Sequence, residues 1–135
     1  MATKIYVNLP VKDLQRSVRF FTAMGFGLNP QLSDEAAACV AISKDIFAML
    51  LTEAKFREIA RRSVADTTRM TEVLTCLSVE SRAKVNQLVD IALSQGGKEV
   101  REPEEHGFMF GRSFSDLDGH IWEIVTMDQR AMEQG

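Results

Sequence analysis

The sequence has few of the residues that would build a disulfide framework, a nucleic-acid surface or a membrane span. It contains two cysteines, Cys39 and Cys76, each alone in an apolar run, which argues against disulfides or a cysteine zinc site and predicts two reduced core thiols. The sequence has 16 Lys and Arg residues and 19 Asp and Glu residues. It therefore lacks the excess of basic residues that would suggest nucleic-acid binding. No apolar run is long enough to cross a bilayer, and MATKIYVNLP lacks a signal-peptide core. We therefore expect a cytoplasmic protein whose partner is a small molecule, not nucleic acid or a membrane.

The length of 135 residues and the hydrophobic content of 45% suit one domain with one core, spanning residues 1–135. Within it, two segments show the same order of patterns, at residues 4–52 and 73–128. Between them, residues 53–72 are polar and rich in charge. We expect this stretch to be a linker that holds a short helix and then a mobile connection.

The first segment is predicted to run strand, helix, then two or three strands. Residues 4–11 are rich in β-formers, Asp13 can cap a helix with apolar residues at helical spacing, and Gly25 ends that helix. After the turn-rich stretch GFGLNPQ, two apolar runs at 36–43 and 45–52 predict a β-hairpin.

The second segment repeats this order. Residues 73–79 predict a strand, Ser81 a helix cap, and an apolar stripe a helix that ends at Gly96. Strands are expected at 98–103, 107–116 and 120–127. The fold class is therefore α+β, built from two βαβββ modules.

Three motifs give this pattern a family resemblance. They are V-K-D-L-x-R-S at residues 11–17, G-F at 25–26 and D-x-D-G-H-x-W-E at 116–123. Together they resemble the vicinal oxygen chelate superfamily, which includes glyoxalases, extradiol dioxygenases, fosfomycin-resistance enzymes and bleomycin-resistance proteins. The resemblance covers residues 4 to about 128. It implies that each module curls into a half-barrel, and that modules pair in a homodimer around a cavity that holds ligand and, in the enzymes, a divalent metal.

The resemblance also implies four metal-ligand positions, one on the first and one on the last strand of each module. They fall on Tyr6, on Met49 or Leu50, on Leu74 and on Glu123. Only Glu123 has a carboxylate, and a phenol, a leucine and a thioether or second leucine do not complete a divalent site. We therefore expect no cofactor and a degenerate metal site in which Glu123 is the single remaining candidate.

Neighbouring residues are not expected to rebuild the site. His120 is three residues from Glu123, so the two side chains should point to opposite faces of a strand. Asp116 and Asp118 are interpreted as turn formers instead of a calcium loop, and His106 as a solvated loop residue. Trp122 should pack beneath the helices.

The expected cavity is mostly apolar with a few polar groups, as in many small-molecule sites. Arg112 is expected either to line it or to neutralise Glu123. The predicted ligand-binding residues are Tyr6, Asn8, Phe47, Leu74, Phe108, Phe110, Arg112 and Glu123. If Glu123 is unpaired, it suits a ligand with an amine and a planar ring.

These features favour a metal-free, small-molecule-binding protein similar to the bleomycin-resistance members. The alternative is a lyase or dioxygenase whose divalent metal is held partly by Glu123. A third class, a structural or regulatory module with a cavity filled by its own side chains, stays open at this point.

Overall fold

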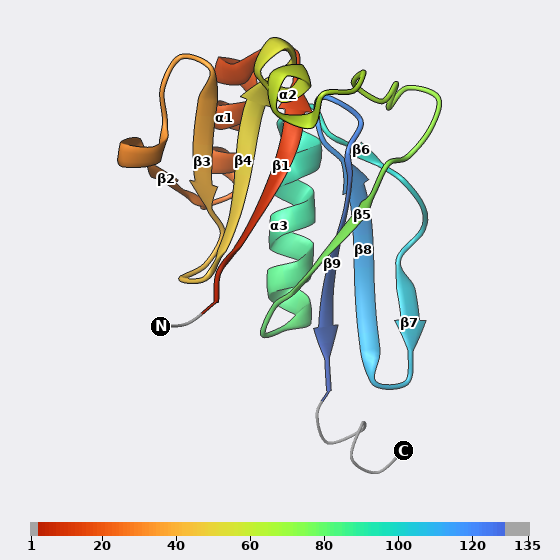
Figure 1. Ribbon diagram of the computed structural model, residues 1–135. Coiled ribbons are helices and arrows are strands. Elements are labelled where there is room, and N and C mark those ends of the chain that lie inside the picture. Colours follow the sequence, from red (N-terminus) through yellow and green to blue (C-terminus); the bar gives the residue numbers. More distant parts are fainter. Residues whose placement is uncertain (1–2, 129–135) are drawn as a thin grey trace. The chain divides into compact units, whose positions relative to one another are not determined.

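The computed structural model describes residues 3–128 and divides the chain into two compact units, residues 1–66 and 67–135 (Figure 1). The first unit contains one sheet in the order β1-β4-β3-β2. Its elements are β1 (Ile5–Val11), α1 (Leu14–Ala23), β2 (Gly27–Asn29), the 3-10 helix η1 (Pro30–Leu32), β3 (Ala37–Ala41), β4 (Ile46–Thr52) and α2 (Glu53–Ala60).

Local signals set the ends of the first helix. The Asp13 carboxylate accepts a hydrogen bond from the Arg16 N–H at 3.1 Å, which satisfies a donor that α1 leaves unpaired. Gly25 follows the helix with φ of 99°, a left-handed conformation that glycine adopts without steric cost. The expected cap and stop are confirmed, as is the hairpin between β3 and β4, which pair antiparallel.

The sheet of the first unit buries the face that α1 covers. Helix α1 packs on β3 and β4, and alternate residues such as Val40, Ala48 and Leu50 are fully buried. These residues share one face by strand register, because directly paired residues point to the same side of a sheet. The opposite face carries Tyr6 and Asn8, which are exposed.

The second unit repeats the arrangement. Its elements are β5 (Leu74–Ser78), α3 (Arg82–Ser94), β6 (Lys98–Glu99), β7 (Glu104–His106), β8 (Met109–Ser115) and β9 (Ile121–Met127). The sheet order is β5-β9-β8-β6, and β7 also pairs with β8. Ser81 caps α3 by accepting from the Lys84 N–H at 3.1 Å, as expected. The α+β class and the βαβββ pattern are confirmed.

The strand expected at residues 98–103 is shorter and interrupted. β6 covers only Lys98–Glu99, and after a break at residues 100–103 the chain returns to the same partner, β8, as β7. Pro103 lies in this break and lacks the N–H that a ladder needs. The interpretation of His106 as a loop residue is wrong, because His106 ends β7 and pairs with Met109.

The residues between α2 and β5 form no helix or strand, yet part of this stretch is anchored in the second unit. The Thr67 hydroxyl donates to the Asp118 carbonyl. The Glu72 carboxylate lies 2.8 Å from the ring of His120. Both contacts fall on the turn between β8 and β9, so the end of the expected linker is held by that turn. No helix within residues 3–128 is long and apolar enough to cross a membrane.

Candidate functional site

Strand register divides the second sheet into a helix-covered face and an open face. On the open face, Cys76 pairs with Glu123, and Glu123 pairs in turn with Ser113. Leu74 shares this face two residues before Cys76 and is 58% exposed. The next residue along β9, Ile124, is fully buried and pairs with Arg112 on the helix-covered face. The register therefore brings Leu74 and Glu123 together and places Arg112 on the other side.

The same register resolves which residue of β4 corresponds to Glu123. In the second unit, Glu123 pairs with Cys76, two residues after Leu74. In the first unit, the residue two after Tyr6 is Asn8, and it pairs with Met49. Met49, and not Leu50, is thus the equivalent of Glu123.

Glu123 is held by an arginine that the sequence did not single out. The Nη2 atom of Arg101 lies 2.5 Å from the Glu123 Oε2 atom, and the Glu123 side chain is 19% exposed. The expectation that Arg112 neutralises this carboxylate is wrong. Arg112 instead donates from Nη1 to the Asp90 carboxylate at 2.9 Å and to the side-chain amide oxygen of Asn86 at 3.1 Å, both on α3.

Arg101 also connects Glu123 to two residues of β7. Its Nε atom donates to the Glu104 carboxylate, which lies 3.1 Å from Nε2 of His106. Hydrogen bonding from the Arg101 guanidinium lowers the pKa of Glu104, and His106 contributes in the same direction. These two hydrogen-bonded carboxylates raise the pKa of Arg101. One guanidinium thus bridges two carboxylates on the open face, a charge-assisted arrangement.

Cys76 departs from the expectation of a core thiol, because it is exposed on this face while Cys39 is buried. Partial burial raises the pKa of the Cys76 thiol and the Glu123 carboxylate raises it further, whereas Arg101 acts in the opposite direction. Its thiol is therefore a weak nucleophile near neutral pH.

The motif around residue 116 builds the turn that leads into β9. The buried Asp116 carboxylate accepts hydrogen bonds from the N–H groups of Asp118 at 2.9 Å and His120 at 3.1 Å, and from the Trp122 indole at 3.0 Å. Gly119 takes a φ of 86° in this turn. These contacts confirm the turn-forming role of Asp116. Trp122 is buried, as expected for a core tryptophan. His120 is buried too, and its ring lies against Glu72, which is 48 residues away.

In the first unit, the predicted site residues form an aromatic pair. The rings of Tyr6 and Phe47 stack with centroids 4.7 Å apart and planes 11° apart. The Asn8 amide donates to the Tyr6 carbonyl at 3.1 Å. The three side chains lie on the face opposite the α1-covered face, in a setting that suits flat apolar groups.

The donors at the four implied positions do not fit a divalent metal. Tyr6, Met49 and Leu74 offer no carboxylate or imidazole, and the one carboxylate is occupied by Arg101. Within residues 3–128, no group of three or more His, Cys, Asp or Glu side chains is arranged to hold an ion. The residues present therefore do not match the donor set that such a metal needs.

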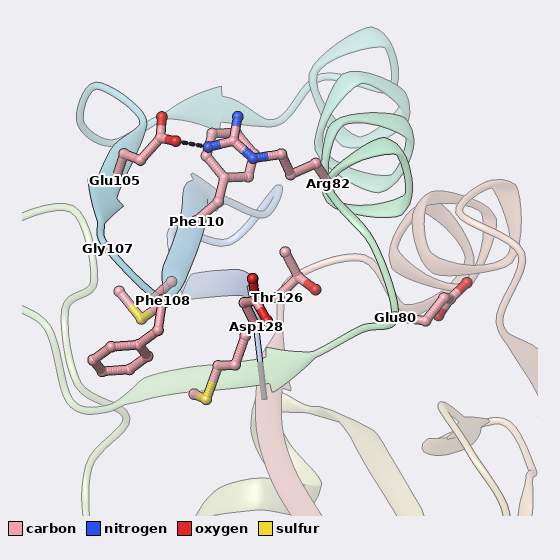
Figure 2. Close-up of a pocket in the computed structure, with 10 residues that line it drawn as sticks. Glu80, Arg82, Glu105, Gly107, Phe108, Phe110, Thr126 and Asp128 are labelled. Atoms are coloured by element: carbon pink, nitrogen blue, oxygen red, sulfur yellow. Dashed lines mark ion pairs between the residues drawn. The ribbon is translucent and has the colours of Figure 1, made fainter. Parts of the chain in front are cut away.

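A pocket of about 560 Å³ lies in the second unit, between the start of α3, the β7–β8 turn and the end of β9. Figure 2 shows Arg82 over the ring of Phe110, where it meets Glu105, and shows Thr126 and Asp128 pointing into the same space. The Arg82 guanidinium carbon is 4.3 Å from the Phe110 ring centroid, a cation–π contact. The lining consists of Glu80, Arg82, Glu105, Gly107, Phe108, Met109, Phe110, Thr126, Met127 and Asp128.

Two of the predicted ligand-binding residues thus line this pocket, and the others do not. Phe110 lies on β8, while Phe108 lies in the turn before it and not on a strand as expected. Arg82 and Thr126 were missed because they lie near the ends of α3 and β9, and Glu80 and Asp128 because they lie outside the strands, where strand parity says little. The ion pair between Arg82 and Glu105 could not be anticipated from sequence spacing, because the residues that form β7 were expected to form a loop.

Comparison with known proteins agrees with this architecture. A family model described as bleomycin resistance protein-like N-terminal matches residues 3–43. A hypothetical protein from S. aureus superposes with a TM-score of 0.78 at 29% identity, covering 93% of this chain and 94% of that one. A glyoxalase/bleomycin resistance protein/dioxygenase family enzyme from Burkholderia phytofirmans gives 0.78 at 15% identity, over 93% and 99%.

A bleomycin resistance determinant encoded on the transposon Tn5 superposes with a TM-score of 0.66 at 16% identity, over 94% of this chain and 99% of that one. Comparison with curated protein sequences gives no match. The chain has the glyoxalase/bleomycin-resistance fold, and its resemblance to the vicinal oxygen chelate superfamily is confirmed.

Proposed function

We propose that this protein binds a small organic cation, without a metal, in the pocket beside α3. The observation that carries the proposal is the pocket itself, whose volume of about 560 Å³ falls within the range of small-molecule sites. The similarity to a bleomycin resistance determinant and to the matching N-terminal family model supports binding over chemistry. The donor set around Glu123 supports a metal-free protein.

The charge of the pocket favours a positively charged ligand. Glu80, Glu105 and Asp128 contribute three carboxylates against the single guanidinium of Arg82, and Arg82 is already paired with Glu105. A cation entering the pocket would offset this excess of negative charge. The Glu123 carboxylate, expected from the sequence to receive an amine, is less suited because Arg101 already binds it.

The apolar part of the lining favours a ligand with a ring or an alkyl body. Phe108 is 43% exposed and Met127 is 41% exposed, so both present apolar surface at the pocket. Thioethers and aromatic rings adapt to flat apolar groups. The proposed ligand class is therefore an amphipathic amine.

A charge series of probes tests the proposal. We expect 2-phenylethylamine to raise the melting temperature, whereas the neutral 2-phenylethanol and the anionic phenylacetate leave it within error. At ten times the dissociation constant, binding adds about 1.4 kcal/mol, which corresponds to about 3–5 °C for a domain of this size.

Matched variants locate the effect. Asp128→Asn should weaken the response to the amine at least about tenfold in dissociation constant, while Glu123→Gln should keep the wild-type response. If all three probes act equally, or if Glu123→Gln removes the response and Asp128→Asn keeps it, the pocket is not the binding site.

A further inference from the structure

The pocket lies where the sheet of the second unit extends past the beginning of α3. Phe110 and Thr126 pair across β8 and β9, so both lie on the helix-covered face, as Arg112 does. Arg112 bonds to Asn86 one turn into α3. Phe110, two residues earlier on β8, meets Arg82 at the first residue of the helix. The helix begins at Arg82, so it does not cover the sheet beyond this point.

Arg82 covers the ring of Phe110 at this end of the helix. Its guanidinium carbon lies 4.3 Å from the ring centroid, and its Nη2 atom pairs with the Glu105 carboxylate on β7 (Figure 2). One flat cation thus contacts a ring and a carboxylate at the same time. A guanidinium suits both contacts because it is planar, weakly hydrated and rich in N–H donors.

Both contacts of Arg82 are open to solvent, so they are easily broken. The Arg82 side chain is 54% exposed, and the Glu105 side chain is 63% exposed. At such positions an ion pair or a cation–π contact changes an equilibrium constant by about fivefold or less. A ligand that brings its own cation into the pocket can therefore replace Arg82 with only a modest loss of affinity.

We propose that the cation subsite of the pocket is the space that Arg82 fills, and that the ligand carries a guanidinium or amidinium group that displaces Arg82 from Phe110 and Glu105. The inference rests on the proposed function and deepens it, because it narrows the ligand class from amines to flat, delocalised cations. The apolar body of such a ligand lies against Phe108 and Met127, which also line the pocket. Arg82 sets the affinity, since the ligand must compete with it.

Isothermal titration of the full chain with two probes of the same apolar body tests the proposal. The probes are 2-phenylethylguanidine and 2-phenylethylamine. Arg82→Gln, which keeps a good helix former at this position, should bind the guanidine about tenfold more tightly than wild type does, because no internal cation competes. The amine should gain about threefold or less, because an ammonium is a compact, strongly hydrated charge that stacks poorly. Adding Phe110→Leu to Arg82→Gln should abolish the preference for the guanidine.

The displacement of Arg82 has its own readout in the NMR spectrum of wild type. The side-chain protons of Arg82 lie over the Phe110 ring, whose ring current shifts their resonances. Saturating 2-phenylethylguanidine should remove this shift, as Phe110→Leu should do without ligand. Arg82 resonances that keep the shift at saturation would overturn the inference.

Lys84→Gln is the matched control, because it removes the same charge from the first turn of α3. Lys84 lies two residues from Arg82, so the two side chains do not face each other, and Lys84 lies outside the lining of the pocket. If Lys84→Gln tightens guanidine binding as much as Arg82→Gln does, or if Arg82→Gln favours both probes equally, the inference is overturned while the proposed function stands. If wild type binds neither probe at millimolar concentration, the proposed function and this inference both fail.

Discussion

Removing the carboxylate of Asp116 should destabilise the protein strongly, because this one side chain accepts three hydrogen bonds, two of them buried and one part-buried. Asp116→Ala leaves two backbone N–H groups and the Trp122 indole N–H without their acceptor. Each such loss costs about 1–3 kcal/mol, partly offset because a buried carboxylate is no longer desolvated. We expect a net loss of about 3–4 kcal/mol in the free energy of unfolding, or about 10 °C in melting temperature.

Asp116→Asn is the matched control. An asparagine keeps an acceptor for the two backbone donors but turns its amide donors toward the Trp122 indole, so it should cost about 1–2 kcal/mol. Urea unfolding followed by Trp122 fluorescence measures both variants. A loss below about 1 kcal/mol for the alanine variant, or equal losses for both, would refute the assignment of three separate bonds.

The pH dependence of stability, compared between wild type and Asp116→Asn, supplies a second readout. Burial raises the pKa of Asp116 above its ordinary value of 3.8, so the folded state binds this proton more tightly than the unfolded state does. The contribution of Asp116 to stability is then fully present below pH 3.8 and falls as pH rises through the pKa of the folded state. Wild type should lose stability relative to Asp116→Asn as pH rises from about 4, and a flat difference would contradict the burial argument.

Three further expectations concern other parts of the chain. Arg61 ends α2 in the left-handed region with φ of 60°, so Arg61→Gly should raise the free energy of unfolding by about 1 kcal/mol in urea titrations, whereas Arg61→Ala should not. Glu123 raises the pKa of Cys76 and Arg101 lowers it, so Glu123→Gln should lower that pKa and speed alkylation of Cys76 by iodoacetamide at pH 7.5. Buried Cys39 is the unreactive internal reference, and an unchanged alkylation rate would count against the electrostatic coupling of Cys76 to Glu123. The exposed apolar residues of the open faces, among them Tyr6 and Leu74, should be covered in a homodimer. Sedimentation should therefore give twice the chain mass of 15.1 kDa, and Leu74→Lys should shift the equilibrium to monomer. A monomeric wild type would refute this.

The sequence predicted the elements well because their signals are local. Asp13 and Ser81 cap helices through contacts three residues away, and Gly25 ends a helix through its own φ. Strand parity also placed Trp122 in the core opposite Glu123. Such features depend on spacings of two to four residues, which a single sequence records directly.

The site was harder to predict because its contacts join distant residues. Arg101 and Glu123 are 22 positions apart, and their meeting depends on a strand interruption that composition does not locate. Arg112 was one candidate for neutralising Glu123, but its register places it against α3. Cys76 resembled a core residue from its apolar neighbours, yet it falls on the open face.

The most direct test of the proposed function is a titration of ¹⁵N-labelled protein with 2-phenylethylamine, followed through the backbone amide resonances. We predict saturable shifts confined to Gly107–Phe110, Thr126–Asp128 and the first turn of α3, which surround the pocket. Residues 74–76 and Glu123 on the open face should stay unperturbed. Shifts centred on the open face, or no saturable shift at millimolar probe, would contradict the account.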